Sequence, residues 1–431
     1  MLDNWYPLLI NTGPLPDEDI NVAGNIVLDW ARNRIYSYGR VAPFGSVNYK
    51  FWEHNASDGT FVSAHTFPSV CVVSSNAFPS DGDNAARLGT DGFIYMVTSH
   101  GNNNADKLAN CRLSKISPVT WQEVAAVVPW AVAHNGTYGI VGVGSWALAS
   151  FKLAGVDYIG LLLNGQQPAA MEIFNSALSS LCHYDFTVPA GTDDVFVLVG
   201  EQPTASTQRL YLVEDGPIDT QITYVISTFN NAPSIADGGI VTTLNPADID
   251  PSWGAQDNCE LLAPMFCSVD NSIVFFVLAE PLEESKLVKI NHLTGAVVWA
   301  SANVSTTVFS LSLFSIGQAA GLSDLSTGTL VFCNPNHPEY LTVNLTTGAF
   351  TRTASSHLDG PILPNQDGVR QAAVWDSVRE TLVYYYEGSN DLEAAWPVGG
   401  WAVLGTLVGP PLHPGPAGRR PWLAEMGPIR T

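Results

Sequence analysis

Positive charge is scarce in this sequence. The 431 residues include 40 aspartates and glutamates but only 18 lysines and arginines, so the formal net charge is −22. Charged residues make up 13% of the chain, about half the share of roughly 25% that is usual in soluble domains. Because an acidic surface repels a phosphate backbone, no nucleic-acid partner is expected.

The sequence also lacks the patterns that direct a chain out of the cytoplasm. No basic residue precedes Arg32 and no apolar h-region follows the start, so a secretory signal is not recognised. The most apolar stretch, residues 146–163, is interrupted by Lys152 and Asp157, which argues against a transmembrane span. We expect a protein that is made in the host cytoplasm and does not insert into a membrane.

Sequence motifs of catalysis are missing too. The six cysteines show no C-x-x-C spacing, and the nine histidines form no H-x-x-x-H or H-E-x-x-H pair that could chelate zinc. There is no G-x-S-x-G elbow, and Gly142-Val-Gly-Ser-Trp146 is interpreted as a tight turn or bulge. A catalytic triad assembled from distant residues stays open. No catalytic residue and no cofactor is assigned.

Two acidic clusters resemble parts of a calcium site. Ser80-Asp81-Gly-Asp83-Asn84 has the closely spaced oxygen ligands of a calcium loop but lacks the bidentate acid at its far end. Asp248-Ile-Asp250, followed by Asp257, is similarly incomplete. Solvated turns explain both clusters, and no metal site is assigned.

The clearest feature that is present is a repeated hairpin. The segment 286–299 reads as a strand, a tight turn (Asn291-His-Leu-Thr-Gly295) and a second strand that ends at Trp299. The turn pattern N-x-x-[TD]-G returns at Asn344-Leu-Thr-Thr-Gly348 and Asn55-Ala-Ser-Asp-Gly59. Asn suits such a turn because its side chain bonds the local backbone, and Gly suits it because positive φ carries no Cβ penalty.

A repeat of 50 to 60 residues extends this hairpin over the chain. Gly295 and Gly348 lie about 53 residues apart, and weaker turns at similar steps are expected near Trp121, Ser179, Gly238 and Gly400. Strands of continuous apolar character precede the turns, often introduced by an aspartate, whereas no long amphipathic helix is found. The sequence therefore predicts seven units.

Seven strand-rich units of this length favour one closed fold. We predict an all-β, seven-bladed β-propeller over residues 23–408, with six or eight blades as alternatives, because each blade can then bury both faces against its neighbours. Two tandem β-sandwiches are the structural alternative. An N-terminal arm (residues 1–22) and a Pro/Gly-rich C-terminal tail (residues 409–431) are expected to flank the propeller.

One unit supports this fold by resemblance. Asn291-His-Leu-Thr-Gly-Ala-Val-Val-Trp299 resembles the tryptophan-docking repeat of quinoprotein-type propellers. The other two turns depart from that pattern, since Arg352 and Ser63 stand where the repeat has its tryptophan. The resemblance implies a propeller and does not by itself imply quinone chemistry.

The tail suggests a partner. It combines six prolines with a basic end, and Arg419, Arg420, Trp422 and Leu423 are the candidate partner-binding residues. A disordered terminus is the alternative to an arm that docks on a neighbouring subunit.

These observations favour a non-enzymatic structural or adaptor propeller, and we expect a component of a bacteriophage virion near the tail. Its partners would be other virion or assembly proteins, a second copy in a symmetric homo-oligomer, or a host-surface receptor or glycan. The alternative is a propeller enzyme that uses its central channel, either a quinoprotein-like oxidoreductase or a carbohydrate-active enzyme. A sugar-binding lectin is a further alternative, because exposed aromatic rings stack on sugars.

Overall fold

The computed structural model consists almost entirely of β-strands. It describes residues 5–11, 20–29, 31–41, 48–55, 61–66, 86–98, 112–129, 147–163, 170–185, 195–215, 222–254, 258–267, 269–280, 284–304, 329–333, 339–354, 371–376, 381–386 and 400–406. The candidate tail residues Arg419, Arg420, Trp422 and Leu423 lie outside this part of the chain, as do Asp81, Asp83 and Asp257.

The described strands form seven separate antiparallel sheets, which we number as blades 1 to 7 in chain order. Blade 1 contains β2 (Ile20–Asp29), β3 (Arg34–Val41), β4 (Asn48–Asn55) and β5 (Phe61–Thr66). Blade 2 contains β6 (Ala86–Leu88), β7 (Ile94–Thr98), β8 (Arg112–Ile116) and β9 (Glu123–Val127). Blade 3 contains β10 (Ala147–Leu153), β11 (Val156–Leu163), β12 (Ala170–Asn175) and β13 (Ser180–Asp185).

The remaining sheets follow the same plan. Blade 4 contains β14 (Val195–Val199), β15 (Thr207–Asp215), β16 (Ile222–Asn230) and β17 (Ser234–Leu244), after which comes the short helix α3 (Pro246–Ile249). Blade 5 contains β18 (Asn258–Cys267), β19 (Ser272–Glu280), β20 (Glu284–Asn291) and β21 (Val297–Ala300). Blade 6 has three described strands, β22 (Thr329–Cys333), β23 (Glu339–Asn344) and β24 (Phe350–Ala354). Blade 7 contains β25 (Gln371–Asp376), β26 (Thr381–Tyr386), β27 (Gly400–Thr406) and β1 (Trp5–Asn11).

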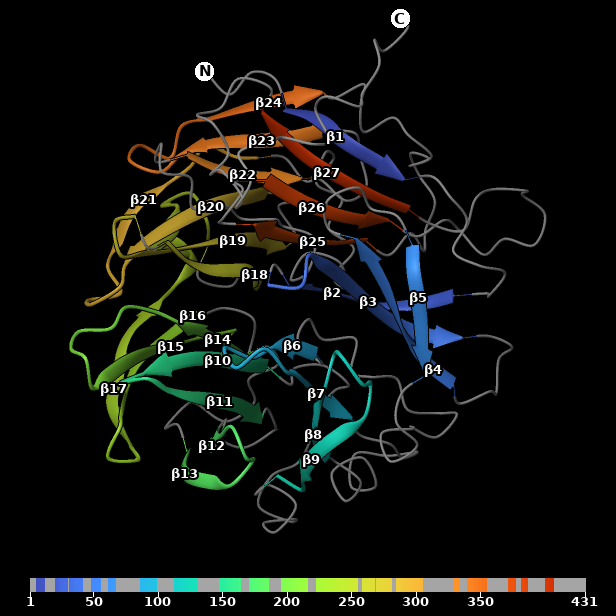
Figure 1. Cartoon of the computed structure of the whole chain (residues 1–431). Helices are drawn as coiled ribbons and strands as arrows, with labels where there is room; N and C mark the ends of the chain where they lie inside the picture. Colours follow the sequence, from blue (N-terminus) through green and yellow to red (C-terminus); the bar gives the residue numbers. More distant parts are fainter. Residues whose placement is uncertain are drawn as a thin grey trace, which may run out of the picture.

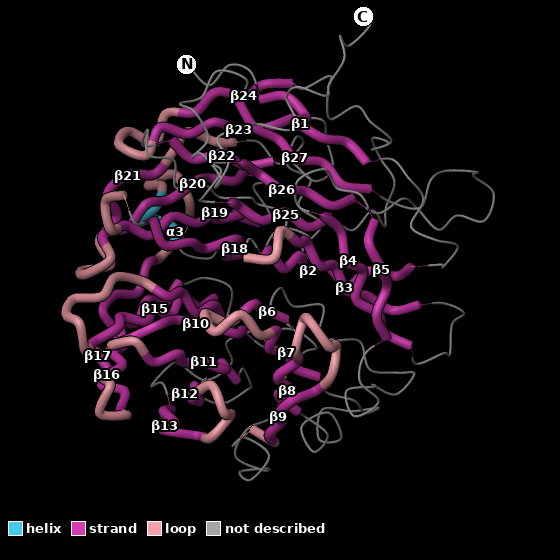
Figure 2. Tube along the Cα trace, in the orientation of Figure 1, coloured by secondary structure: helices cyan, strands magenta, loops and turns pink. Residues whose placement is uncertain are grey.

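The blades stand in a ring, which makes the fold a β-propeller as predicted (Figures 1 and 2). The first strands of neighbouring blades contact one another in the middle, in the pairs β2 with β6, β6 with β10, β10 with β14 and β14 with β18. Strand β2 also contacts β25, so blade 1 meets blade 7. These contacts bring the first strands of the blades together in the middle of the ring.

The N-terminal segment differs from the expected arm. Strand β1 pairs with β27 from Trp5↔Thr406 to Asn11↔Trp401 and so becomes the outer strand of blade 7. Strand β2 begins at Ile20, before the expected boundary at residue 23. The outer strand β27 would otherwise present an unpaired edge, and β1 covers it.

Continuous apolar runs arise because both faces of a blade are covered. In β19, Ile273, Phe275 and Val277 belong to a cluster shared with blade 4, while Val274 and Phe276 belong to a cluster shared with blade 6. All five are buried. Successive side chains of a strand point to opposite faces, so each face needs its own apolar set. Burying one such side chain contributes roughly 1.5–3 kcal/mol.

The turns of the repeat have the predicted chemistry. In the β20–β21 turn, Asn291 Oδ1 accepts hydrogen bonds from the backbone nitrogens of Leu293 (2.9 Å) and Thr294 (3.1 Å), and Gly295 has a φ of 66°. Asn344 accepts the equivalent pair of bonds in the β23–β24 turn, where Gly348 has a φ of 71°. Local Asn bonds and positive φ therefore define both turns.

Two of the weaker predicted turns are present, and one is misplaced. Trp121 and Leu178 take the positive-φ position in the β8–β9 and β12–β13 turns, with φ values of 54° and 61°. Gly238 instead lies within β17. The turn of blade 4 starts at Asn230, whose Oδ1 accepts a bond from the Ala232 nitrogen (3.1 Å). Gly400 begins β27.

The β23–β24 turn of blade 6 docks on the preceding blade. Trp299 of blade 5 donates its indole N–H to the carbonyl of Leu345 in the β23–β24 turn of blade 6 (3.0 Å). Its ring covers Gly348, where a Cβ atom would lie 2.6 Å from Trp299 Cε3. The tryptophan that ends the repeated hairpin therefore packs on the turn of the next blade.

Replacing Gly348 by alanine tests this contact. The variant has to accommodate both positive φ and a Cβ against the Trp299 ring, whereas Gly155→Ala meets a φ of 81° with no atom within 4 Å. We expect Gly155→Ala to lower the free energy of unfolding by about 1 kcal/mol and Gly348→Ala to lower it by about 1–3 kcal/mol more. Denaturant titration of both variants measures the difference, and equal losses would contradict the docking.

Buried His54 provides a test of acid stability. Burial lowers the pKa of this histidine in β4 from 6.5 to about 4, so below pH 6.5 the unfolded chain binds a proton that the folded chain does not. The stability that neutral His54 contributes is fully present above pH 6.5. The free energy of unfolding then falls by roughly 3 kcal/mol as the pH drops from 6.5 to 4. Unfolding free energies of wild type and His54→Gln, measured across this range, should show a shallower fall for the variant; parallel curves would be inconsistent with a neutral buried His54.

Candidate functional site in the central channel

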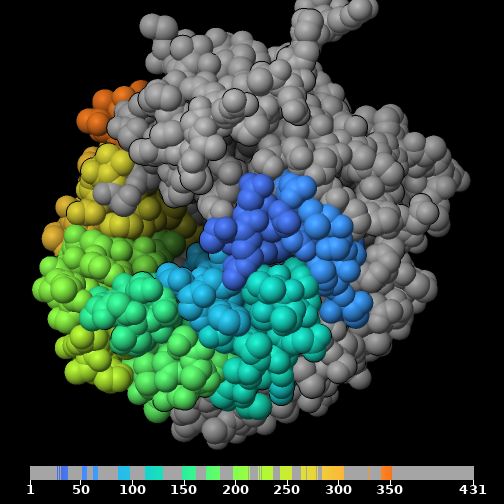
Figure 3. Space-filling view, viewed as in Figure 1, coloured from blue at the N-terminus to red at the C-terminus, as the bar shows by residue number. Residues whose placement is uncertain are grey.

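A cavity of about 430 Å³ opens where the first strands of blades 2 to 5 meet. Its volume is within the range of about 300–1,000 Å³ that is usual for small-molecule sites. Figure 3 shows the described residues of these blades following one another around the middle of the molecule. The lining comes from β6 and the turn after it, from β10, and from the ends of β14 and β18.

One wall of the cavity is polar and comes from blades 2 and 3. It contains the guanidinium of Arg87 and the hydroxyls of Thr90 and Ser150. Arg87 donates an N–H to the backbone carbonyl of Leu148 in the next blade. The Thr90 backbone nitrogen donates to Ser150 Oγ (3.0 Å), and Thr90 Oγ1 lies 2.6 Å from Asp157 Oδ1. Bonds between neighbouring blades thus fix this wall.

The lining residues from blades 4 and 5 are apolar. This apolar wall consists of Leu198 and Val199 of β14 and Pro264, Met265 and Phe266 of β18. The pairing of β18 with β19 shifts its register between Leu262 and Met265, because Pro264 has no N–H to donate to the ladder. Such a bulge re-aims the side chains of its strand.

An aromatic stack supports the apolar wall from behind. Phe266 stacks on Tyr211, with ring centroids 5.5 Å apart and planes at 20°. Tyr211 in turn lies over Gly200, where a Cβ atom would be only 1.9 Å from the tyrosine ring. The glycine is therefore required for this approach.

Arg87 differs from the other arginines whose side chains are described. Each of those forms an ion pair with a carboxylate, in the pairs Arg32–Asp29, Arg34–Glu53, Arg112–Glu123 and Arg209–Glu201. Within the described ranges no carboxylate pairs with Arg87. Its side chain is accessible to water, yet the surrounding strands partly desolvate it and lower the pKa of the guanidinium from its usual value. An arginine stays protonated in proteins, so the cavity contains a positive charge.

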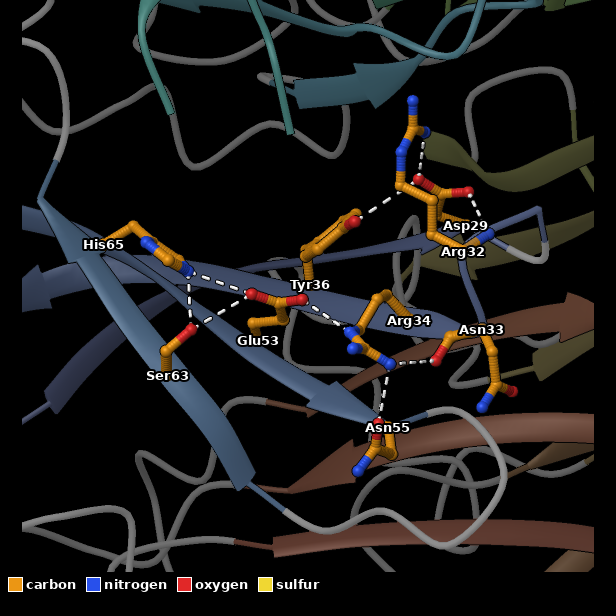
Figure 4. Close-up of polar contacts among 9 residues, drawn as sticks. All are labelled: Asp29, Arg32, Asn33, Arg34, Tyr36, Glu53, Asn55, Ser63 and His65. Atoms are coloured by element: carbon orange, nitrogen blue, oxygen red, sulfur yellow. Dashed lines mark hydrogen bonds and ion pairs between the residues drawn. The ribbon is translucent and has the colours of Figure 1, made fainter. Parts of the chain in front are cut away.

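A second polar cluster lies on blade 1 (Figure 4). Glu53 accepts hydrogen bonds from Arg34 Nε (2.5 Å) and Ser63 Oγ (3.0 Å), and His65 Nε2 lies 3.0 Å from the same carboxylate. Burial alone would raise the pKa of Glu53, but the bonds from His65, Arg34 and Ser63 together lower it below its usual value. The His65 ring stacks on Trp121 of blade 2, with centroids 4.0 Å apart.

This cluster has the residue types of a catalytic triad but not the geometry. In a triad the serine and the acid contact opposite nitrogens of the histidine. Here Ser63 Oγ (2.7 Å) and Glu53 Oε2 both contact Nε2 of His65. The network holds β3, β4 and β5 together and docks Trp121.

The described acidic residues of the calcium hypothesis have structural partners. Asp248 bonds the backbone and side chain of Asn245 at the start of α3. Asp250 pairs with Lys286 and bonds Ser252, and these bonds lower the pKa of its carboxyl to about 2. The described residues contain no group of three or more potential metal ligands.

Sequence analysis did not identify the cavity residues. Arg87 stands in the short strand Ala86–Leu88 without a motif around it, and Ser150 belongs to an apolar stretch. One signal was available, since a lone arginine at the end of a first strand is unusual in a chain this acidic. The cavity residues come from β6, β10, β14 and β18, and only the ring of blades brings these four strands together.

A stability comparison separates Arg87 from cations that support the fold. Lys289 pairs with Asp270 and donates to the Leu345 carbonyl (2.9 Å). We expect Lys289→Met to lower the free energy of unfolding by about 2 kcal/mol, because it removes the charge-assisted hydrogen bond to Asp270 and one of the two donors to the buried Leu345 carbonyl. Arg87→Met should change the free energy of unfolding by about 1 kcal/mol or less, because it removes an exposed charge that has no carboxylate partner together with a single hydrogen bond to the Leu148 carbonyl. Urea denaturation distinguishes the two; a large loss for Arg87→Met would mean that the guanidinium supports the fold.

Comparisons with known proteins show which solved structures share the fold. No protein-family model matches the chain, and no curated protein matches it significantly. Among solved structures, the polysaccharide lyase Uly1 is similar at a TM-score of 0.53 and 10% identity, covering 92% of this chain and 91% of its own. An oligogalacturonate lyase in complex with manganese is also similar, with a TM-score of 0.44 and 11% identity over 94% of this chain and 98% of its own. The periplasmic gluconolactonase of Pseudomonas aeruginosa has a TM-score of 0.45 and 8% identity over 77% of this chain and 85% of its own. At such identities the likeness establishes the fold alone.

These comparisons correct the expected role. The prediction of a non-enzymatic structural component of a phage virion is contradicted by the similarity to the polysaccharide lyase Uly1, which favours the enzyme alternative. The virion location predicted with that role has no support. The sequence evidence against enzymatic activity was the lack of local motifs, and a propeller builds its site from several blades, so such motifs are not required.

The described helices include none that is long and apolar enough to cross a membrane.

Proposed function

We propose that the chain is a carbohydrate-active enzyme that binds its substrate in the central cavity. The observation that carries this proposal is the cavity itself, whose lining combines the cationic Arg87 with apolar residues that include Phe266. Saccharides present both hydroxyl groups and C–H faces, so they fit a site that offers both hydrogen-bond donors and an aromatic ring. The similarity to a polysaccharide lyase supports the choice of substrate class.

Arg87 can contribute to chemistry as well as binding. A fixed guanidinium in a partly desolvated site stabilises negative charge that develops in a transition state, for example when a proton is removed next to a carboxylate. The other described lining residues are not titratable near neutral pH. The described part of the cavity therefore supplies binding and charge stabilisation, and proton transfer is assigned to no residue.

The quinoprotein resemblance is explained by packing. Trp299 docks on the next blade at the periphery of the ring, through Leu345 and Gly348. That contact belongs to the repeat and places no group in the cavity. We therefore favour the carbohydrate branch of the enzyme hypothesis over the quinone branch.

Activity assays on polysaccharides test the proposal. The full chain is incubated with a panel of uronate-containing, sulfated and neutral polysaccharides, and chain cleavage is followed by the growth of new reducing ends and by the ultraviolet absorbance of unsaturated products. We expect cleavage of at least one polymer, and a loss of about 100-fold in kcat/KM for Arg87→Met, because one charge-stabilising donor contributes that much to catalysis.

Arg112→Met is the matched control. It removes the same charge from the outer strands, where Arg112 pairs with Glu123 (2.5 Å), and should keep wild-type activity. Saccharide binding without cleavage of any polymer would indicate that the chain is a lectin and not an enzyme. Equal losses for the two variants would argue against catalysis in the cavity.

A further inference from the structure

We infer that Arg87 and Ser150 form an oxyanion subsite, which holds a carboxylate or sulfate group carried by the saccharide. The inference rests on the proposed function only in that the ligand is a saccharide. It specifies which part of that ligand the polar wall recognises.

The hydrogen bonds of Arg87 leave most of its donors free. A guanidinium has five N–H groups, and within the described residues one of them donates to the Leu148 carbonyl. That bond holds one terminal nitrogen of the guanidinium, Nη1, against blade 3. The remaining N–H groups have a planar arrangement that matches the two oxygens of a carboxylate, or two oxygens of a sulfate.

The charge of Arg87 has no counter-ion among the described residues. The protein carries 40 acidic side chains, and the four other arginines with described side chains are all paired with one. An unpaired charge that is partly removed from water costs free energy. A ligand that brings its own negative charge would remove that cost, which explains why the polar wall has an arginine and no acid.

Ser150 adds a second donor beside Arg87. Its oxygen already accepts a hydrogen bond from the Thr90 backbone nitrogen (3.0 Å), which leaves its hydroxyl hydrogen available to the cavity. Thr90 cannot serve in the same way, because its hydroxyl bonds Asp157 (2.6 Å). The available groups of the wall are therefore donors, and a group that only accepts, such as an oxyanion, satisfies them all.

The apolar wall explains why the oxyanion belongs to a larger molecule. Met265 and Phe266 also line the cavity, and a small inorganic anion would leave this apolar part of the lining in contact with water. A sugar ring with one acidic substituent can place that substituent at Arg87 and its C–H face on Phe266. A monoanionic saccharide unit therefore fits both walls.

Calorimetric titration of the full chain tests the subsite. The probes are a uronic acid oligosaccharide, a sulfated oligosaccharide and the neutral parent oligosaccharide. The variants are Arg87→Met, Arg87→Lys, Ser150→Ala and the control Arg112→Met. We expect tight binding of at least one acidic probe, weakened about 10- to 100-fold by Arg87→Met and about 3- to 10-fold by Ser150→Ala. Neutral probe should bind wild type and Arg87→Met equally weakly.

Arg87→Lys keeps the charge and loses the planar fork, so it also tests the subsite if Arg87→Met fails to fold. A larger loss for the uronate than for the sulfated probe identifies the carboxylate as the bound group, and the reverse identifies the sulfate. Wild-type affinity of both Arg87 variants for the acidic probes would overturn the subsite, as would equal affinity of wild type for acidic and neutral probes.

Failure of the proposed function gives a different result. If no saccharide binds but an aromatic carboxylate, used as a non-sugar probe, binds wild type and not Arg87→Met, the subsite stands and the carbohydrate proposal falls. If a neutral saccharide binds in the cavity and Arg87 has no effect, the carbohydrate proposal stands and the subsite falls.

Discussion

Neighbouring blades are held together where the turn between the last two strands of one blade rests on the blade before it. A buried or half-buried side chain of the earlier blade donates to a backbone carbonyl of that turn: Lys115 to Ser176 (2.6 Å), Tyr224 to His292 (2.6 Å) and Trp299 to Leu345 (3.0 Å). Between blades 1 and 2 the same place is filled by the Trp121 ring on His65. Because a hydrogen bond is directional, each of these hydrogen bonds fixes the rotation of one blade relative to the next. Five apolar clusters, each shared by two blades, stabilise the arrangement.

The candidate site depends on these rotations. Its polar wall belongs to blades 2 and 3 and its apolar wall to blades 4 and 5, so the distance between Arg87 and Phe266 is set by how three neighbouring interfaces are packed. Arg87 is itself anchored across one of them, on the Leu148 carbonyl. Substitutions at the periphery, far from the cavity, can therefore change the site by turning a blade.

The sequence indicated the fold because residues close together in the chain determine each repeated turn and strand. Asn291 and Asn344 bond their own turns, glycine supplies positive φ, and a strand such as β19 is apolar from Ile273 to Ala279 because both of its faces are buried. The turn of blade 4 was misplaced because Asn230 starts it without the expected glycine. The role of β1 was missed because its partner β27 lies at the other end of the chain. The site could not be predicted, since Arg87, Ser150 and Phe266 become neighbours only through the order of blades in the ring, and no local pattern records that order.

The pairing of β1 with β27 has a consequence for synthesis. About 390 residues separate Asn11 from Gly400, and at translation rates of roughly 5–20 residues per second the first strand waits on the order of 20–80 s for its partner. During that time the growing ring is an open arc, with an apolar face at each end and a strand that can pair with the wrong edge. A nascent chain of this kind is a natural client for ribosome-associated chaperones until its last blade has been made.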